Sequence, residues 1–496
     1  MAKDHSSHKQ ILRATSIVGG AQVITILIRI VLTKIIAVLL GPTGVGIAGL
    51  YQSTIEIVKS ATGLGLDFSA VRDVAEAAGS GDLQRIGRTV TILRRWVWVT
   101  GLLGVAMMLM FREQFSLYAF KGSDHAVDFV ILAVVPLFTA LSGGQMAILR
   151  GVRRIGDMAR AGVLGAVSGF SISVPFYWLM GIKGIVPALV LASLAELGIS
   201  WSFAKRIKVT PVVVTLSETV TGGTRMIQLG LFTVITGVAT TGTMYLVRIF
   251  IAGQMGVDGV GQFQAAWNLS ATYVGLILGA MAADYYPRLS AVNTDNHQVC
   301  KLVNEQTEIT LLLAGPLIVG MVCFMDVVVS LFYSAKFEES INILLWQTIG
   351  NLLKVISWPM GFVLLAKGKG NYFIFTELLW NTLFLSTIWF LWEHSGIEST
   401  GIAFLMGYIV LTGVIFVICK RMCGFSWSDK NKKSILTFTI LALLAFVNAK
   451  YQTLPFWRMI SLGLLMISVF LSYYELKKVI DLKMVMNKLL KLIGLS

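Results

Sequence analysis

Charged residues are scarce in this sequence: Asp, Glu, Lys and Arg together make up 14% of its 496 residues. Soluble proteins carry roughly 25%, whereas hydrophobic residues reach 56% here. A soluble core could not bury that much apolar surface. Apolar runs such as 17–28, 96–110 and 401–418 recur along the chain, separated by short charged or glycine-rich breaks. This pattern indicates that most of the chain lies in a lipid bilayer.

Cysteine and histidine are also rare, and their spacing argues against a metal site. Of the five histidines, His125 and His394 are each isolated in an expected outer loop. No two cysteine pairs stand at zinc-ligand spacing. We therefore interpret the cysteines as structural; they are Cys300, Cys323, Cys419 and Cys423.

Catalytic motifs are absent as well. The sequence contains no GxxxxGK[ST] loop, no HExxH and no GxSxG, which are the motifs of nucleotide hydrolysis and of common hydrolases. The expected outer loops are short and carry no acidic pair suited to sugar chemistry. We therefore expect neither an enzyme nor a bound cofactor.

The net charge of +15 could suggest a nucleic-acid partner, but no binding module accompanies it. Most of the 41 Lys and Arg residues lie instead in every second loop between the apolar spans, which places them on one side of the membrane. Such a bias follows the positive-inside rule and predicts that both termini are cytoplasmic. The N-terminus has no convincing cleavage site after its apolar stretch, so we expect it to remain as the first helix.

The apolar pattern predicts about fourteen membrane-spanning helices. Their expected ranges are 15–39, 46–70, 88–110, 127–149, 160–180, 184–204, 226–252, 259–284, 309–333, 341–365, 371–392, 398–419, 434–449 and 457–475.

An internal repeat is the next feature. The turn at 41–46, Gly-Pro-Thr-Gly-Val-Gly, is echoed by Gly-Val-Asp-Gly-Val-Gly at 256–261, and a second Gly-Ile turn at 181–185 is echoed at 396–402. Six helices separate the copies, so both halves enter the membrane from the same side and the repeat is parallel. We predict an all-α membrane protein with a six-helix lobe at 1–212, a second at 213–425 around a central cavity, and an extra hairpin with a basic tail at 426–496.

Few ionisable residues lie inside the predicted spans, and most of those are cationic. Charge at mid-bilayer is costly, so such residues usually face a cavity or a partner. We predict an anion site lined by five cations: Arg29, Lys34, Lys59, Arg248 and Lys354. Two alternatives stay open. Lys59 could simply neutralise Glu56 one helical turn away, and Lys34 and Arg248 could reach toward the outer interface.

A second set of residues is acidic. A relay for H⁺ or Na⁺ needs a carboxylate in an aqueous path, and the candidate coupling or gating carboxylates are Glu56, Asp67, Asp284, Asp326 and Glu377. The alternative is that they pair with neighbouring arginines, as the spacing of Asp67 with Arg72 and of Asp284 with Arg288 allows. The membrane potential is a further candidate driving force.

Several of these motifs together resemble a known family. They are the cationic first helix running into Gly41–Ile47, the turn Arg150–Arg154, the helix end Tyr286–Ser290, and the stretch with Trp346, Lys354–Trp358, Ala366–Lys369 and Glu377. In residues 10–425 the sequence resembles the Wzx-type O-antigen flippases, in the polysaccharide-transport branch of the multidrug/oligosaccharidyl-lipid/polysaccharide (MOP) exporter superfamily.

The resemblance implies a monomeric, alternating-access protein of the bacterial inner membrane. Its cargo would be an undecaprenyl-diphosphate-linked glycan, moved to the periplasmic leaflet among membrane lipids, and its partners a polysaccharide polymerase and a chain-length regulator. Arg29, Lys34, Lys59 and Arg248 occupy places where the family carries cavity cations. The extra hairpin is similar to that of fourteen-helix lipid II flippases. A multidrug or cation antiporter on the same fold, and a non-transporting scaffold, are the rival interpretations.

Overall fold

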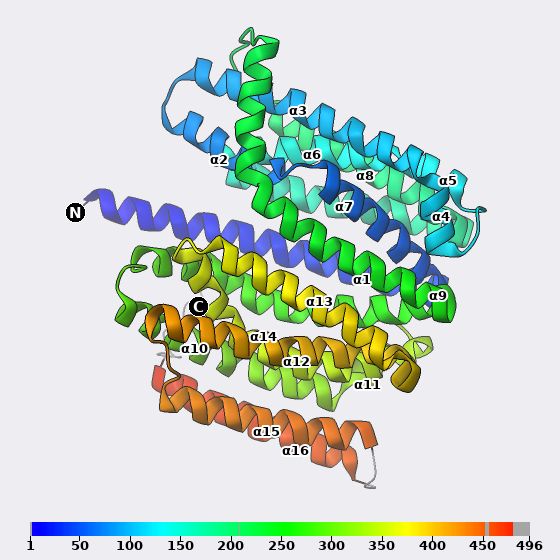
Figure 1. The fold of residues 1–496 in the computed structure, drawn as a ribbon, viewed down its shortest axis with the longest axis vertical. Coiled ribbons are helices and arrows are strands. Elements are labelled where there is room, and N and C mark those ends of the chain that lie inside the picture. The colour runs from blue at the N-terminus through cyan, green and yellow to red at the C-terminus, as the bar shows by residue number, and fades with distance from the viewer. Residues whose placement is uncertain (1, 208, 452–455, 480–496) are drawn as a thin grey trace, which may run out of the picture. The chain divides into compact units, whose positions relative to one another are not determined.

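The computed structural model describes residues 2–207, 209–451 and 456–479 of the chain, and in these residues it contains helices and no strands (Figure 1). The longer helices are α1 (Ala2–Thr62), α3 (Leu83–Met110), α6 (Val134–Gly151), α7 (Ile155–Met180), α8 (Ile185–Ala204), α9 (Leu216–Ala291), α10 (Asn296–Cys323), α12 (Glu338–Ala366), α13 (Gly370–Ser395), α14 (Ser399–Cys423), α15 (Asp429–Tyr451) and α16 (Trp457–Val479). Shorter helices are α2 (Leu66–Gly79), α4 (Arg112–Phe120), α5 (Ala126–Leu132) and α11 (Met325–Phe332).

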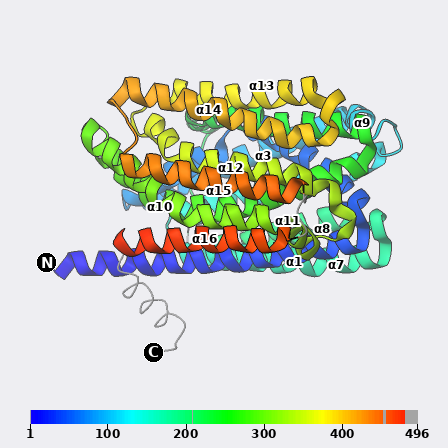
Figure 2. The same ribbon diagram turned by 90° about the horizontal axis from the view of Figure 1, so that it is seen from below.

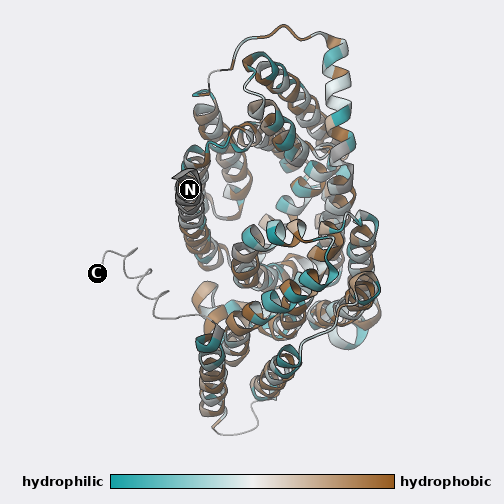
Figure 3. Cartoon of the chain, turned by 90° about the vertical axis from the view of Figure 1, so that its left-hand side faces the viewer, coloured by the Kyte–Doolittle hydropathy of each residue, from teal (hydrophilic) through white to brown (hydrophobic). Residues whose placement is uncertain are grey.

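Ten stretches of the described residues are long and apolar enough to cross a membrane. Four of them, Gly19–Thr62, Ile155–Ala204, Thr233–Gly279 and Gly370–Cys423, are 44 to 54 residues long, about twice the length that one crossing needs. Figure 3 shows hydrophobic residues along most of the helices. The chain is thus an all-helical, multi-pass membrane protein, as predicted; the count of fourteen crossings stays a prediction.

Each of the four long stretches is interrupted at a glycine with a positive φ angle, and these glycines repeat. Gly41 and Gly256 have φ of 65° and 72° and ψ of −166° and −170°. Gly181 and Gly396 have φ of 57° and 51° and ψ of −132° and −136°. Other residues rarely adopt such angles. In both pairs the two glycines are 215 residues apart, which is the spacing between the repeated turns at 41–46 and 256–261.

The repeat extends to the helix ends. The amide of Arg154 donates to the carbonyl of Leu149, and that of Lys369 to the carbonyl of Leu364, each at 2.9 Å. The residues before them, Arg153 and Gly368, have positive φ angles. The turns that follow α6 and α12 therefore have the same hydrogen bond and the same positive φ angle. The two halves of the chain share local backbone structure as well as glycine spacing.

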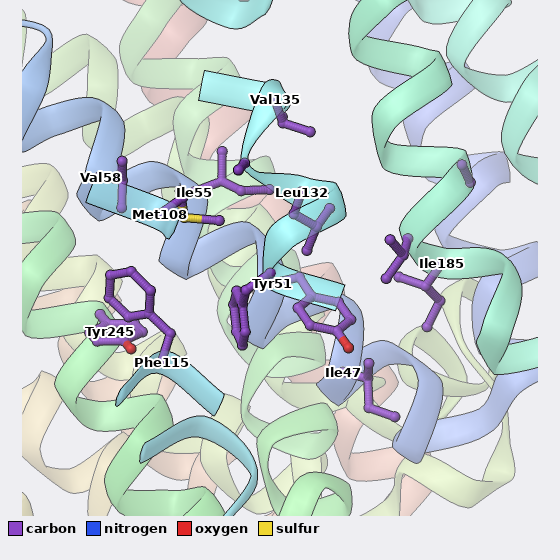
Figure 4. Close-up of a cluster of buried hydrophobic side chains, with 14 of the residues drawn as sticks. Ile47, Tyr51, Ile55, Val58, Met108, Phe115, Leu132, Val135, Ile185 and Tyr245 are labelled. Carbon is purple, nitrogen blue, oxygen red and sulfur yellow. The ribbon is translucent and has the colours of Figure 1, made fainter. Parts of the chain in front are cut away.

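The chain packs as two compact units. Unit 1 comprises Met1–Gln264 with Phe332–Lys336, and unit 2 comprises Ala265–Leu331 with Phe337–Ser496. In unit 1, α3, α6, α7 and α8 pack against one another and α1 packs on α7. Figure 4 shows part of its core, where Tyr51 and Ile55 of α1 lie near Leu132 of α5, and Phe115 of α4 lies beside Tyr245 of α9. The lobe boundaries at 212 and 425 remain predictions.

In unit 2, α10 packs against both helices of the C-terminal hairpin, α15 and α16, and Figure 2 shows the three running alongside one another. Polar contacts fix the hairpin at both ends. Asn431 donates to the carbonyl and the side-chain oxygen of Asn304 at 2.9 and 3.0 Å. At the other end, Lys450 and the Trp346 indole both bind Glu398. The hairpin is therefore an integral part of this unit. The basic tail expected after it lies mostly outside the described residues.

Replacing Asn431 by Ala is expected to destabilise unit 2 by about 1–3 kcal/mol, because the fully buried amide would leave the Asn304 oxygens with fewer donors. The thermal unfolding midpoint of purified protein measures this. Lys433→Ala, at an exposed position of the same helix, is the control and should leave the midpoint unchanged. An unchanged midpoint for Asn431→Ala would contradict the assigned anchoring.

Two sequence expectations are wrong. The stretches 71–87 and 285–308, which the expected spans leave as long loops, are mostly helical. They contain most of α2, the start of α3, the end of α9 and the start of α10. Asp326 does not lie inside the ninth span: α10 ends at Cys323, and Asp326 lies in the first turn of the separate helix α11. The apolar run continues from α10 into α11, so hydropathy alone could not reveal the break at Phe324.

Candidate functional site

The two cations predicted in the first span have different surroundings. Arg29 of α1 is exposed. Lys34, five residues later, is partly buried and donates from Nζ to the backbone carbonyl of Tyr333 at 2.5 Å. Tyr333 follows α11 and belongs to the same unit. Arg29 is therefore open to a ligand in this structure, whereas Lys34 holds the chain segment after α11.

Glu56 and Lys59 lie one helical turn apart in the second half of α1. Lys59 forms an ion pair with Asp67 of α2 at 3.3 Å. The two alternatives that spacing left open were neutralisation of Lys59 by Glu56 and pairing of Asp67 with Arg72. The structure instead pairs Lys59 with Asp67, because the chain bends between α1 and α2 at Gly65 (φ 70°). Lys59 and Asp67 both remain partly exposed to solvent or ligand.

Arg248 of α9 is buried, with 5% of its surface exposed. Its Nε donates to Oε1 of Gln264 at 2.8 Å and its Nη1 to the carbonyl of Met244 at 3.2 Å. Glu56 of α1 is close enough to interact with it electrostatically. Arg248 thus does not reach out to an interface; it is held inside unit 1 by an amide, a carbonyl and a nearby carboxylate.

Lys354 belongs to unit 2, where it meets one of the predicted carboxylates. Its ammonium lies 5.8 Å from the ring centre of Tyr408 on α14 and interacts electrostatically with Glu377 of α13. Three helices, α12, α13 and α14, therefore bring Lys354, Glu377 and Tyr408 into one neighbourhood, in which Lys354 and Glu377 are half-buried. The structure brings Arg248 near Glu56 and Lys354 near Glu377, and each unit holds its own cation and carboxylate.

The remaining predicted carboxylates serve ion pairs near helix ends. Asp284 binds Arg288 at 3.2 Å, as its spacing predicted. Asp326 binds Arg458 of α16 at 3.3 Å. Exposed pairs of this kind contribute at most about 1 kcal/mol each to stability.

Sequence reasoning missed a cluster at the expected outer side of unit 1. The Tyr51 hydroxyl donates to Asp128 at 2.5 Å and lies 2.9 Å from Nδ1 of His125, which in turn lies 2.8 Å from Asp128. Phe120 lies against the imidazole, with ring centres 4.0 Å apart. His125 is therefore not isolated. Only its spacing of three residues from Asp128 hinted at this, because Tyr51 is distant in sequence.

The two repeated glycine turns contact each other through equivalent residues. Thr43 donates to Asp258 at 2.6 Å, and these two positions are 215 residues apart. A Cβ atom on Gly46 would lie 1.9 Å from the carbonyl oxygen of Val257, and one on Gly261 would lie 2.0 Å from that of Pro42. Each turn thus needs a glycine where the other crosses it. We call this contact the outer crossing.

A multi-pass helical chain with an internal repeat and ionisable residues within its spans has the architecture of a membrane transporter. Solved structures share this fold. The chain superposes on the "Lipid II flippase MurJ, inward closed conformation" with a TM-score of 0.71 at 13% identity, covering 92% of this chain and 98% of that one. An inward-facing multidrug resistance MATE family transporter of the MOP superfamily gives 0.69 at 18% identity, covering 82% and 96%. The fold is therefore that of the MOP superfamily.

The chain belongs to the family described as "Polysaccharide biosynthesis protein", whose model matches residues 35–342. Among characterised relatives, the Lipid III flippases of Escherichia coli (strain K12) and Shigella flexneri are each 22% identical over 397 residues, which is 78% of this chain and 94% of the relative. Membership of a polysaccharide family, which the sequence motifs indicated, is thus confirmed, and the fold is that of the MOP exporters.

Proposed function

We propose that this protein is a flippase of the bacterial inner membrane that moves an undecaprenyl-diphosphate-linked oligosaccharide, such as an O-antigen unit, from the cytoplasmic to the periplasmic leaflet. One observation carries the proposal: Arg29, an exposed guanidinium, lies within a membrane-spanning helix of a chain from a polysaccharide-biosynthesis family. The relatives named Lipid III flippase support a lipid-linked cargo.

The physical argument concerns the diphosphate. Two phosphates cannot enter hydrocarbon without losing their hydration. The guanidinium groups of Arg and the ammonium groups of Lys in a water-filled cavity can replace that water. Arg29 is exposed and Lys59 is partly exposed beside Asp67, and these two cations are the first contacts we propose. Lys34, Arg248 and Lys354 complete the proposed set. The polyprenyl tail would stay in lipid while the glycan passes through the cavity.

The first rival function is export of cationic drugs, since one of the structural neighbours is named a multidrug resistance MATE family transporter. Such cargo requires exposed carboxylates in the cavity, and Glu56 is the exposed carboxylate within the α1 span. Arg248 lies close to it, so it is not an uncompensated negative charge. The second rival, flipping of lipid II, shares the diphosphate chemistry and differs only in the glycan.

A deletion strain separates these functions. We expect it to lose surface polysaccharide and to accumulate the lipid-linked oligosaccharide, with unchanged susceptibility to cationic drugs. Heightened drug susceptibility with normal surface polysaccharide would contradict the proposal. Loss of cell-wall synthesis with normal lipid-linked oligosaccharide levels would point to lipid II.

The driving force and the partners complete the proposal. Transport would be coupled to H⁺, Na⁺ or the membrane potential, with Glu377 beside Lys354 as the leading carboxylate, and the polymerase and chain-length regulator would receive the product on the periplasmic side. A monomer with two rocking lobes, 1–212 and 213–425, would suffice for this cycle. Removing the proton or sodium gradient separately from reconstituted vesicles tests the coupling.

A further inference from the structure

The outer crossing lies close to the buried arginine of unit 1, and one glutamine connects them. Gln264 follows Gly261 by one helical turn on α9. Its Oε1 accepts from Arg248 at 2.8 Å. The same oxygen would lie 3.0 Å from a Cβ atom on Gly49 of α1. Gln264 is therefore packed between the arginine and the helix that follows the first repeated turn.

This hydrogen bond joins two arms of one kinked helix. Arg248 lies before the break in α9 at Gly256, and Gln264 lies after it. The position of the second arm is fixed by the crossing, since Gly261 contacts the carbonyl of Pro42 and Asp258 accepts from Thr43. Separating the turns removes the contacts that hold Gln264 against α1 and beside Arg248.

We propose that Gln264 is a positioning residue that withholds Arg248 from an anion while the outer turns are crossed, and that separation of the turns releases the guanidinium. For its ligand this inference rests on the proposed function, because a diphosphate is the anion in question. The crossing and the binding site are then coupled: the outer-closed state keeps Arg248 occupied by the protein, and the outer-open state offers it to the cargo.

The charges around Arg248 fit this role. Glu56 balances the guanidinium while it is buried, and the ring of Phe263 lies 6.0 Å from it. A diphosphate bound at Arg248 competes with the Gln264 oxygen for the same N–H donors. Removing that competing acceptor must therefore strengthen anion binding, and replacing it with a carboxylate must weaken it.

The test measures binding of farnesyl diphosphate to the full-length protein in nanodiscs. Gln264→Ala is expected to bind about tenfold more tightly and Gln264→Glu about tenfold more weakly than the wild type, since a hydrogen bond to a charged group changes affinity by at least that factor. Gln228→Ala, at an exposed position of the same helix, serves as the matched control and should leave the affinity unchanged. A purely structural role of Gln264 would not give opposite signs for Ala and Glu.

A second measurement does not need any Gln264 variant to fold. In protein whose native cysteines are replaced and whose crossing is locked by a reducible, disulfide-containing cross-link between Thr43→Cys and Asp258→Cys, adding Arg248→Gln should leave the affinity for farnesyl diphosphate unchanged; after reduction of the link, Arg248→Gln should weaken binding about tenfold. An equal loss in both states would overturn the inference. If Arg29→Glu also left binding unaltered, the diphosphate site itself would be wrong, which separates the two failures.

Discussion

Arg29→Glu is expected to reduce flipping of the lipid-linked oligosaccharide by at least about 100-fold, or about 2.7 kcal/mol. The substitution replaces an attraction by a repulsion, and two unit charges about 4 Å apart interact by about 4 kcal/mol at the effective dielectric of a protein surface. Arg29 is exposed, so the variant should fold. Surface polysaccharide in a complemented deletion strain reports the effect in cells.

The matched control reverses an exposed arginine outside the proposed site. Arg421 lies in the last turn of α14 among the basic residues of the expected cytoplasmic loops. Arg421→Glu should keep polysaccharide near the wild-type level. Normal polysaccharide in the Arg29→Glu strain, at normal protein abundance, would remove the basis of the diphosphate site.

Locking the outer crossing is expected to abolish transport. The Thr43 and Asp258 side chains already touch, so cysteines at both positions should be joined by a short bifunctional thiol reagent. Alternating access requires the outer side to open once in each cycle, and a covalent link across the two turns prevents that. Flipping in proteoliposomes should fall to the background rate after cross-linking.

The native cysteines must be replaced first, because the sulfur atoms of Cys300 and Cys423 lie only 3.8 Å apart and could react themselves. The single variants Thr43→Cys and Asp258→Cys, treated with the same reagent, are the controls and should retain transport. Undiminished flipping by fully cross-linked protein would show that the turns never separate, and the crossing would then be a fixed part of the fold.

The sequence predicted the helical membrane class and the repeat because both depend on properties written locally in it. A span requires a run of apolar residues, and a turn with a positive φ angle requires glycine. Gly41 and Gly256 could therefore be paired by spacing alone, and their backbone angles agree within a few degrees.

Partners of charged side chains were harder to predict. Helical spacing offered Glu56 as one possible partner of Lys59, yet Lys59 binds Asp67 beyond a bend. Gln264 had no distinguishing motif, since its role depends on the packing of α1 against a kinked α9. Tyr51 and Asp128 are 77 residues apart, and no local pattern joins them. Such contacts arise from tertiary packing, which hydropathy and spacing do not encode.

The central claim is that this chain moves a diphosphate-linked glycan across a bilayer. The direct measurement reconstitutes the purified protein in vesicles with a fluorescent polyprenyl-diphosphate oligosaccharide and records its transfer between leaflets. Our account predicts rapid transfer by the wild-type protein, background transfer by Arg29→Glu, and little transfer of an otherwise identical lipid with a neutral linkage. Equal transfer of the charged and neutral lipids, or no acceleration over protein-free vesicles, would contradict it.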